Sequence, residues 1–269
     1  MRRKRLLAVA LLVIPAWLMM PLADQIHSES AHLRYGTARV TRELRDRIGQ
    51  GMAIALLAGF RGVVADFLWI RSHDYWIKQE WLRQYSAIQV VTMLQPLSTM
   101  FWDIGAWHMA WNIGYAVSID PANANEAVGI KREHEWWDRA RDYLQRGIEN
   151  VPNRPDLYFS MGWLYWEKYK DGCKAQEYFQ KALDAKGAPQ DLDVRLDAVQ
   201  RIEARAKEKC GDVMGAYQDW RRMWLQDHSK VDQIWTVVER EIKRLENELN
   251  IPDNQRIFPK HPATRTPTR

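Results

Sequence analysis

Apolar residues recur at intervals of three and four positions over most of this sequence, and this periodicity constrains the fold more than any other feature. It runs from Thr41 to about Asn250, whereas the alternation typical of β-strands is scarce. Proline and glycine separate the periodic stretches, and we place Pro96 and Pro155 in the first turns of helices. The pattern therefore predicts an all-α protein in which turns join one amphipathic helix to the next.

The first residues predict a membrane anchor. A basic cluster at 2–5 precedes an apolar run, Leu6 to Leu22, that contains no charge. Its length of about 17 residues is the lower limit for a spanning helix, and such a basic cluster stays in the cytoplasm. We expect an uncleaved signal-anchor helix at 1–23, because the residues before Ala23 make a poor cleavage site. A cleaved signal peptide is the alternative. The rest of a bacterial chain of this kind would face the periplasm from a single pass in the inner membrane.

A second apolar stretch at 51–70 bears on this localisation. It contains Arg61 and Asp66, and each charge is costly in lipid. We therefore predict a buried helix of the soluble domain. A second span is the alternative, and it would return the domain to the cytoplasm. The predicted organisation is an anchor at 1–23, a polar spacer at 24–40, a helical domain at 41–250 and an extended, basic, proline-containing tail at 251–269.

The clearest internal pattern lies between Tyr158 and Pro189. Gly162 and Ala175 are small where two antiparallel helices would approach closely, and bulky residues would fill the gaps between helix pairs. The whole set resembles a tetratricopeptide repeat (TPR): Tyr158, Met161, Gly162, Tyr165, Ala175, Phe179, Ala182 and Pro189. The resemblance implies a TPR-like α-solenoid of antiparallel helix pairs.

Other segments extend this resemblance to a group of bacterial membrane-anchored TPR-like proteins. They are Gly59–Arg71, Leu94–Pro96, and Leu144–Ile148 followed by Pro152. The resemblance implies the fold and the anchor, and no catalytic site comes with it. Because TPR arrays usually bind other proteins, we expect a scaffold that mediates protein–protein interaction. A permanent structural subunit of a large membrane or envelope complex is one alternative, and an enzyme with an unrecognised site is another.

The TPR resemblance also implies a groove for a partner protein or peptide, lined by the first helix of each pair. The residues implied to line it are Trp102, Met109, Asp156, Phe159, Trp163, Trp166 and Glu167. Aromatic side chains in a groove suit an apolar peptide or a partner helix. The alternative is that these aromatic side chains pack internally against other helices.

No motif indicates catalysis, a cofactor or a metal. The sequence lacks a phosphate-binding glycine loop, a His-Glu-x-x-His pair and a nucleophile elbow. His108 occupies a packing position of the repeat, and His134 with Glu135 lacks a third ligand at useful spacing. We therefore expect no enzyme activity. The net charge of +5 comes largely from the two ends, so nucleic acid is not an expected partner.

The two cysteines, Cys173 and Cys210, fall in turns between the helices of their pairs. Such turns stack along one edge of a solenoid, so the two thiols would form a disulfide in an oxidising compartment. Two free thiols are the alternative if the repeat spacing exceeds the reach of a disulfide.

Overall fold

The computed structural model describes residues 59–185, 196–226 and 233–260. Every regular element in these ranges is helical and none is a strand, which confirms the predicted all-α class. Within the same ranges, no helix combines the length and the apolar character needed to cross a membrane. The predicted anchor at 1–23 and spacer at 24–40 lie outside the described residues. The chain divides after Phe101 into two compact units, whereas the periodicity predicts one helical domain over 41–250.

The first unit is built on a helical hairpin of α4 (Arg61–Ile77) and α5 (Trp81–Leu94). Gln79 lies in the turn between them and has a positive φ of 57°. The core of the hairpin is small and consists of Ala65, Val91, Leu94 and Phe101. Trp69 extends this core, since its ring lies 5.0 Å from that of Phe101.

The second apolar stretch of the sequence becomes part of α4, but only one face of this helix is buried. Ala65 and Ser72 are its buried residues. Arg61 and Asp66 are exposed instead of being paired in the interior, so the expectation of a buried helix holds for one face alone. The residues at 51–58 lie outside the described ranges.

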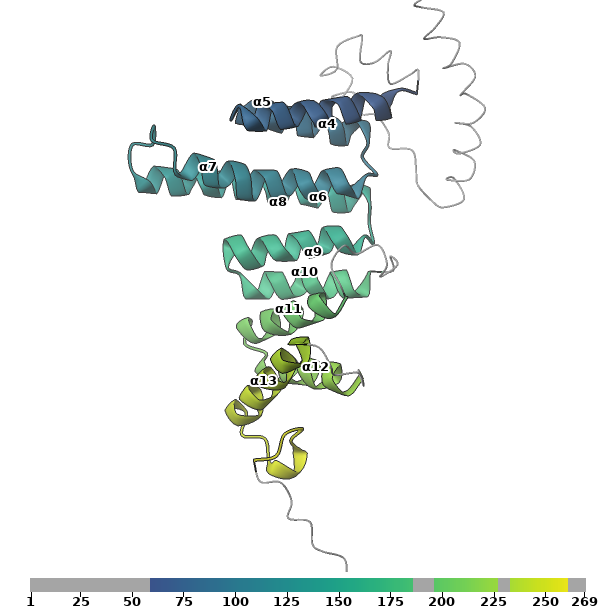
Figure 1. The fold of residues 1–269 in the computed structure, drawn as a ribbon, viewed down its shortest axis with the longest axis vertical. Coiled ribbons are helices and arrows are strands. Elements are labelled where there is room, and N and C mark those ends of the chain that lie inside the picture. Colours follow the sequence, from purple (N-terminus) through teal and green to yellow (C-terminus); the bar gives the residue numbers. More distant parts are fainter. Residues whose placement is uncertain (1–58, 186–195, 227–232, 261–269) are drawn as a thin grey trace, which may run out of the picture. The chain divides into compact units, whose positions relative to one another are not determined.

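The second unit is a succession of helices, each packed against its neighbour in sequence. They are the remainder of α6 (Thr99–Trp107), the π-helical segment η1 (His108–Ile113), α7 (Gly114–Ser118), α8 (Glu126–Asn150), α9 (Pro155–Leu164), the π-helical segment η2 (Tyr165–Tyr169), α10 (Gly172–Asp184), α11 (Leu196–Lys209), α12 (Val213–Gln226) and α13 (Gln233–Glu248). From α7 onward, each α-helix contacts the next one along the chain (Figure 1).

Local sequence signals set the starts of these helices. Pro155 lies in the first turn of α9, where a missing N–H costs nothing. Pro96, also predicted to lie in the first turn of a helix, lies instead in the turn before α6, which begins at Thr99. The side chain of Asn125 accepts a hydrogen bond from the Val128 N–H and caps α8. Asp171 caps α10 by accepting from the Lys174 N–H at 2.9 Å. Each cap satisfies one of the backbone donors that a helix start leaves without a partner.

Two glycines allow the close approach of neighbouring helices. A Cβ at Gly147 of α8 would lie 2.8 Å from Cγ of Trp102, and one at Gly162 of α9 would lie 2.7 Å from Cδ1 of Phe179. Both distances are shorter than a carbon–carbon contact allows. Gly162 is therefore small for the reason that the repeat pattern implies.

The first residues of the predicted tail, 251–260, are described by the structure and are not extended. A short 3₁₀ turn at Asp253–Gln255 folds back toward α13. Glu246 has no exposed surface, and its carboxylate accepts hydrogen bonds from the N–H groups of Ile257 and Phe258 at 2.5 and 3.4 Å. Tyr217 donates to the same carboxylate at 3.3 Å. This buried acceptor fastens residues 251–258 to the end of the unit.

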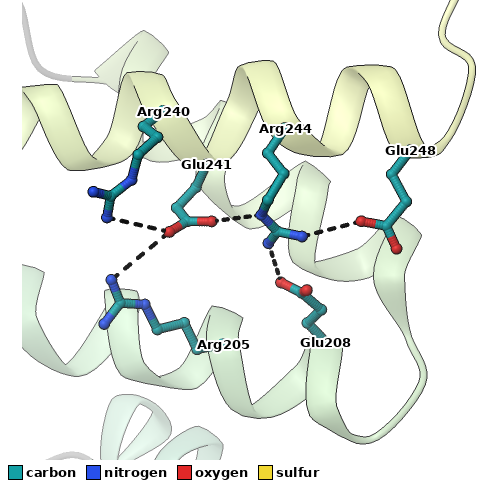
Figure 2. A network of polar contacts seen from close by, with 6 residues as sticks. All are labelled: Arg205, Glu208, Arg240, Glu241, Arg244 and Glu248. Atoms are coloured by element: carbon teal, nitrogen blue, oxygen red, sulfur yellow. Dashed lines mark hydrogen bonds and ion pairs between the residues drawn. The ribbon is translucent and has the colours of Figure 1, made fainter.

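A charged network also ties α13 to α11 (Figure 2). Arg244 lies at its centre and contacts Glu208 at 2.6 Å, Glu241 at 2.9 Å and Glu248 at 3.0 Å. Figure 2 also shows Arg205 and Arg240 converging on Glu241. The hydrogen bond to Glu208 is the largest cause that raises the pKa of Arg244. Since the guanidinium is charged at any physiological pH, Arg244 keeps its positive charge in this network over that range.

Candidate protein-interaction surface

Two of the predicted groove residues lie in the core of the second unit. Trp102 is 4% exposed, and its ring packs against that of Tyr143 at 4.6 Å. Met109 has no exposed surface. The face of α6 and η1 that carries them is turned toward α8, where Gly147 makes room for the indole. Trp102 and Met109 therefore do not line an open groove, which corrects the expectation from the repeat pattern.

The three predicted aromatic residues of α9 and η2 are half-buried. Phe159, Trp163 and Trp166 pack against a cluster formed by Ala175 and Phe179 of α10 with Ala206 of α11. Phe159 and Trp163 stack with ring centroids 6.1 Å apart, and Lys209 places its ammonium 4.1 Å from the ring centre of Trp166. These side chains mainly pack between neighbouring helices, in agreement with the alternative that the aromatic residues pack internally.

The two predicted acidic residues make local ion pairs. Asp156 lies 3.2 Å from Nε of Arg154, and Glu167 lies 3.5 Å from Nζ of Lys170. Both pairs join residues close together in sequence at the two ends of the α9–η2 helix. Neither carboxylate converges with another titratable group in a way that would support acid–base chemistry.

The most exposed aromatic residues of the second unit lie on the opposite side of the same α6–α7 helix. We call the aromatic face the set Trp107, Trp111, Tyr115 and Ile119. Trp107 is 48% exposed, Tyr115 59% and Ile119 60%, whereas Trp111 is half-buried. Their regular spacing of four residues keeps them on one side because the π-helical turn of η1 is wider than an α-turn.

Lys168 connects the two π-helical segments beside the aromatic face. Its ammonium lies 5.5 Å from the ring centre of Trp111 in η1 and 5.4 Å from that of Trp137 in α8. Glu133 lies 3.5 Å from the same ammonium. Cation–π contacts and a partly buried ion pair thus fix Trp111 in place. The Trp137 indole N–H is buried and has no hydrogen-bond partner among the residues that the structure describes.

The polar contacts near Lys168 involve the side chains of Tyr169 and His108 and orient their rings. Tyr169 donates a hydrogen bond to Asp138 at 2.7 Å, and burial followed by this bond raises the pKa of Tyr169. His108 shares a 2.8 Å hydrogen bond with Asn112. Across the described residues, no group of three or more His, Cys, Asp or Glu side chains is placed to hold a metal ion.

Cys173 and Cys210 are joined by a disulfide, with their Cα atoms 4.6 Å apart. Cys173 lies in the first turn of α10 and Cys210 directly follows α11. A Cβ at Gly172 would lie 2.6 Å from Cβ of Lys209, so the two helix ends are close enough for the bond. The structure therefore brings the cysteines together along one edge of the helix stack.

Comparison with known proteins gives no family assignment. The chain matches no protein-family model, and no curated protein matches it significantly.

The aromatic face was not among the residues that the repeat pattern implied. The α6–η1–α7 segment is apolar on two sides, and periodicity alone does not say which side is buried. The spacing of four shared by Trp107, Trp111 and Tyr115 is the signal that could have located it. The π-helical turn, which keeps these residues aligned, has no signature in the sequence.

Proposed function

We propose that this protein is a membrane-anchored, TPR-like α-solenoid that binds another protein through the aromatic face. The observation that carries the proposal is the exposure of Trp107 and Tyr115, 48% and 59%, on one side of the same helix. Exposed aromatic clusters of this kind mark interaction sites, and tryptophan and tyrosine dominate the binding energy of interfaces. This face fits an apolar or amphipathic helix of a partner protein.

Three features support the scaffold part of the proposal. Successive helices pack in chain order from α7 to α13. Gly162 lies against the ring of Phe179, so that α9 and α10 approach closely. Lys168 contacts the ring of Trp111 in the aromatic face, and a side chain already held in place loses less entropy on binding. The anchor is supported by the charge-free run at 6–22 behind its basic cluster, and it would hold the scaffold on the periplasmic side of the inner membrane.

Site-specific photo-crosslinking in native membranes tests the proposal. A photo-reactive amino acid replaces Trp107 in the full-length chain, and a matched control replaces Gln145, which is exposed on α8. We expect a discrete crosslinked protein from position 107 and none from position 145. Absence of a product at 107, or the same products at both positions, would count against the aromatic face as the binding surface.

A further inference from the structure

Helix α4 of the first unit carries a second apolar face, opposite the one that packs on α5. Val63, Phe67, Ile70 and Ile77 are 64–68% exposed, whereas Ala65 and Ser72 are buried on the other side. A surface helix of a soluble protein normally has one apolar stripe. Four large side chains so exposed on a 17-residue helix indicate a surface that something else covers.

The spacing on this face is that of a coiled-coil seam. We call the α4 seam the alternating three- and four-residue series Phe60, Val63, Phe67, Ile70, Asp74 and Ile77. A strict series of this kind is the narrow stripe by which one helix packs on another, and a membrane-surface helix has a wider one.

The charges beside the α4 seam point to the identity and direction of the partner helix. Asp66 and Arg71 flank the seam on opposite sides and lie five residues apart. In a parallel pair of identical helices, these flanking positions face each other across the interface. Asp66 of one copy would then meet Arg71 of the other, twice per dimer. In an antiparallel pair, each residue would instead meet its own counterpart, and like charges would repel.

Both side chains are available for this contact. Asp66 is exposed, and no ion pair joins it to another described residue. Arg71 is half-exposed and reaches Asp74 of its own helix at 3.6 Å, while a guanidinium has donors enough for a second carboxylate. Asp74 is the one polar residue on the seam, and in a parallel pair it faces Asp74 of the other copy. Arg71 offsets part of this like charge at 3.6 Å, and a polar seam residue fixes the register at a cost in stability.

We propose that the α4 seam is a parallel dimerisation surface, in which α4 pairs with α4 of a second copy of this chain. The parallel direction agrees with the proposed membrane anchor, and in this respect the inference rests on the proposed function. Two chains inserted by their N-termini into one membrane present α4 in the same orientation. Confinement to the membrane also raises their effective concentration, which a short seam needs.

A charge-exchange experiment on the full-length chain tests the dimer. The protein is solubilised in mild detergent, and its mass is measured by light scattering over a dilution series. We expect a dimer whose dissociation constant rises about tenfold for Asp66→Arg or Arg71→Asp alone, since each substitution creates two like-charge contacts. The double variant Asp66→Arg/Arg71→Asp restores the wild-type value, because its two charges again alternate in sign.

The contrary results are equally specific. A monomeric wild-type chain, or a double variant that stays as weak as the single ones, overturns the proposal. Ile70→Glu should abolish the dimer with unchanged helicity, and Leu225→Glu, at an exposed position of α12, should leave it intact. A dimer that survives Ile70→Glu forms elsewhere and likewise refutes the α4 seam.

Lipid reporters separate this inference from the proposed anchor. An environment-sensitive dye is placed at Val13→Cys or at Ile70→Cys in vesicles of phosphatidylcholine and phosphatidylglycerol that contain nitroxide lipids. Quenching at position 70 means that lipid covers the seam, which overturns the dimer. A lack of quenching at position 13 refutes the anchor, while the mass measurement still decides the dimer.

Discussion

At Gly147 the backbone of α8 lies against the indole of Trp102, with space for a hydrogen atom only. Gly147→Ala adds a Cβ at 2.8 Å from Cγ of that indole, so we expect an overpacking cost of about 1–3 kcal/mol. The melting temperature should fall by roughly 2–4 °C for each kcal/mol in a unit of this size. Thermal unfolding by circular dichroism measures it. Gln145→Ala on the exposed face should change stability by less than about 0.5 kcal/mol.

A buried charge cluster between α11 and α12 makes stability depend on pH. Lys207 contacts Asp219 at 2.5 Å and Glu203 at 3.3 Å, and both carboxylates are less than a tenth exposed. Burial raises the pKa of Glu203, although the charge of Lys207 acts against it. A carboxyl group whose folded-state pKa is raised loses folding stability as the pH rises through that value.

Removing the cation should expose this dependence. Lys207→Met leaves the buried Glu203 without a counter-charge, whereas Asp219 keeps Arg222 at 2.8 Å, and we expect a loss of about 3–5 kcal/mol at neutral pH. The loss should shrink at acidic pH as Glu203 takes up a proton, which urea unfolding at several pH values measures. Lys174→Met removes a surface pair with Glu177 and should cost less than about 1 kcal/mol at either pH. Equal losses for both variants would contradict the buried-cluster account.

Single residues also show where sequence reasoning succeeds and where it stops. Gly162 was correctly placed at a close helix contact, because a small residue amid bulky ones has a direct steric meaning. Trp102 and Met109 were assigned to a groove but are core residues. Their helix is apolar on two sides, and the choice between the sides depends on where α8 lies, which no local pattern specifies.

At the scale of elements, the Glu246 carboxylate is a buried acceptor for the segment after α13, beside the contacts of Arg256 and Phe258 with the same unit. Glu246→Ala removes the acceptor shared by Ile257, Phe258 and Tyr217, and buried donors left without a partner cost about 1–3 kcal/mol. We expect faster amide exchange at 257–258 and faster tryptic cleavage after Arg256. Glu248→Ala, which removes an exposed partner of Arg244, should leave both rates unchanged. Unchanged rates in Glu246→Ala would show that the segment is held by other contacts.

The disulfide is the covalent link between α10 and α11. It joins residues 37 apart in sequence, and closing such a loop in the unfolded chain stabilises the fold by about 2–4 kcal/mol. Reductant should lower the melting temperature of the wild type and leave that of Cys173→Ser/Cys210→Ser unchanged. Thiols that react with maleimide in freshly isolated membranes without reductant would argue against the bond and against an oxidising compartment.

Helix boundaries were more predictable than helix environments. Pro155 in α9 and the turn at Gly211, whose φ is +97°, follow from backbone chemistry that is local to the sequence. The exposure of α4 on one side, the π-helical segments and the folded segment after α13 depend on tertiary contacts. Periodicity identifies an apolar face but not the partner that covers it.

At the scale of the whole chain, the protein that we propose is a membrane-held scaffold of TPR-like helix pairs that binds its partner through the aromatic face. The measurement that tests this most directly is quantitative co-purification of the crosslinked partner with the full-length chain from native membranes. Trp107→Ser/Tyr115→Ser should lower recovery of the partner at least about tenfold, because aromatic residues at the centre of an interface contribute about 2 kcal/mol or more to binding. Helicity and the yield of the protein in the membrane should stay unchanged. Trp166→Ala should have a smaller effect. Undiminished recovery in the double variant would contradict the central claim.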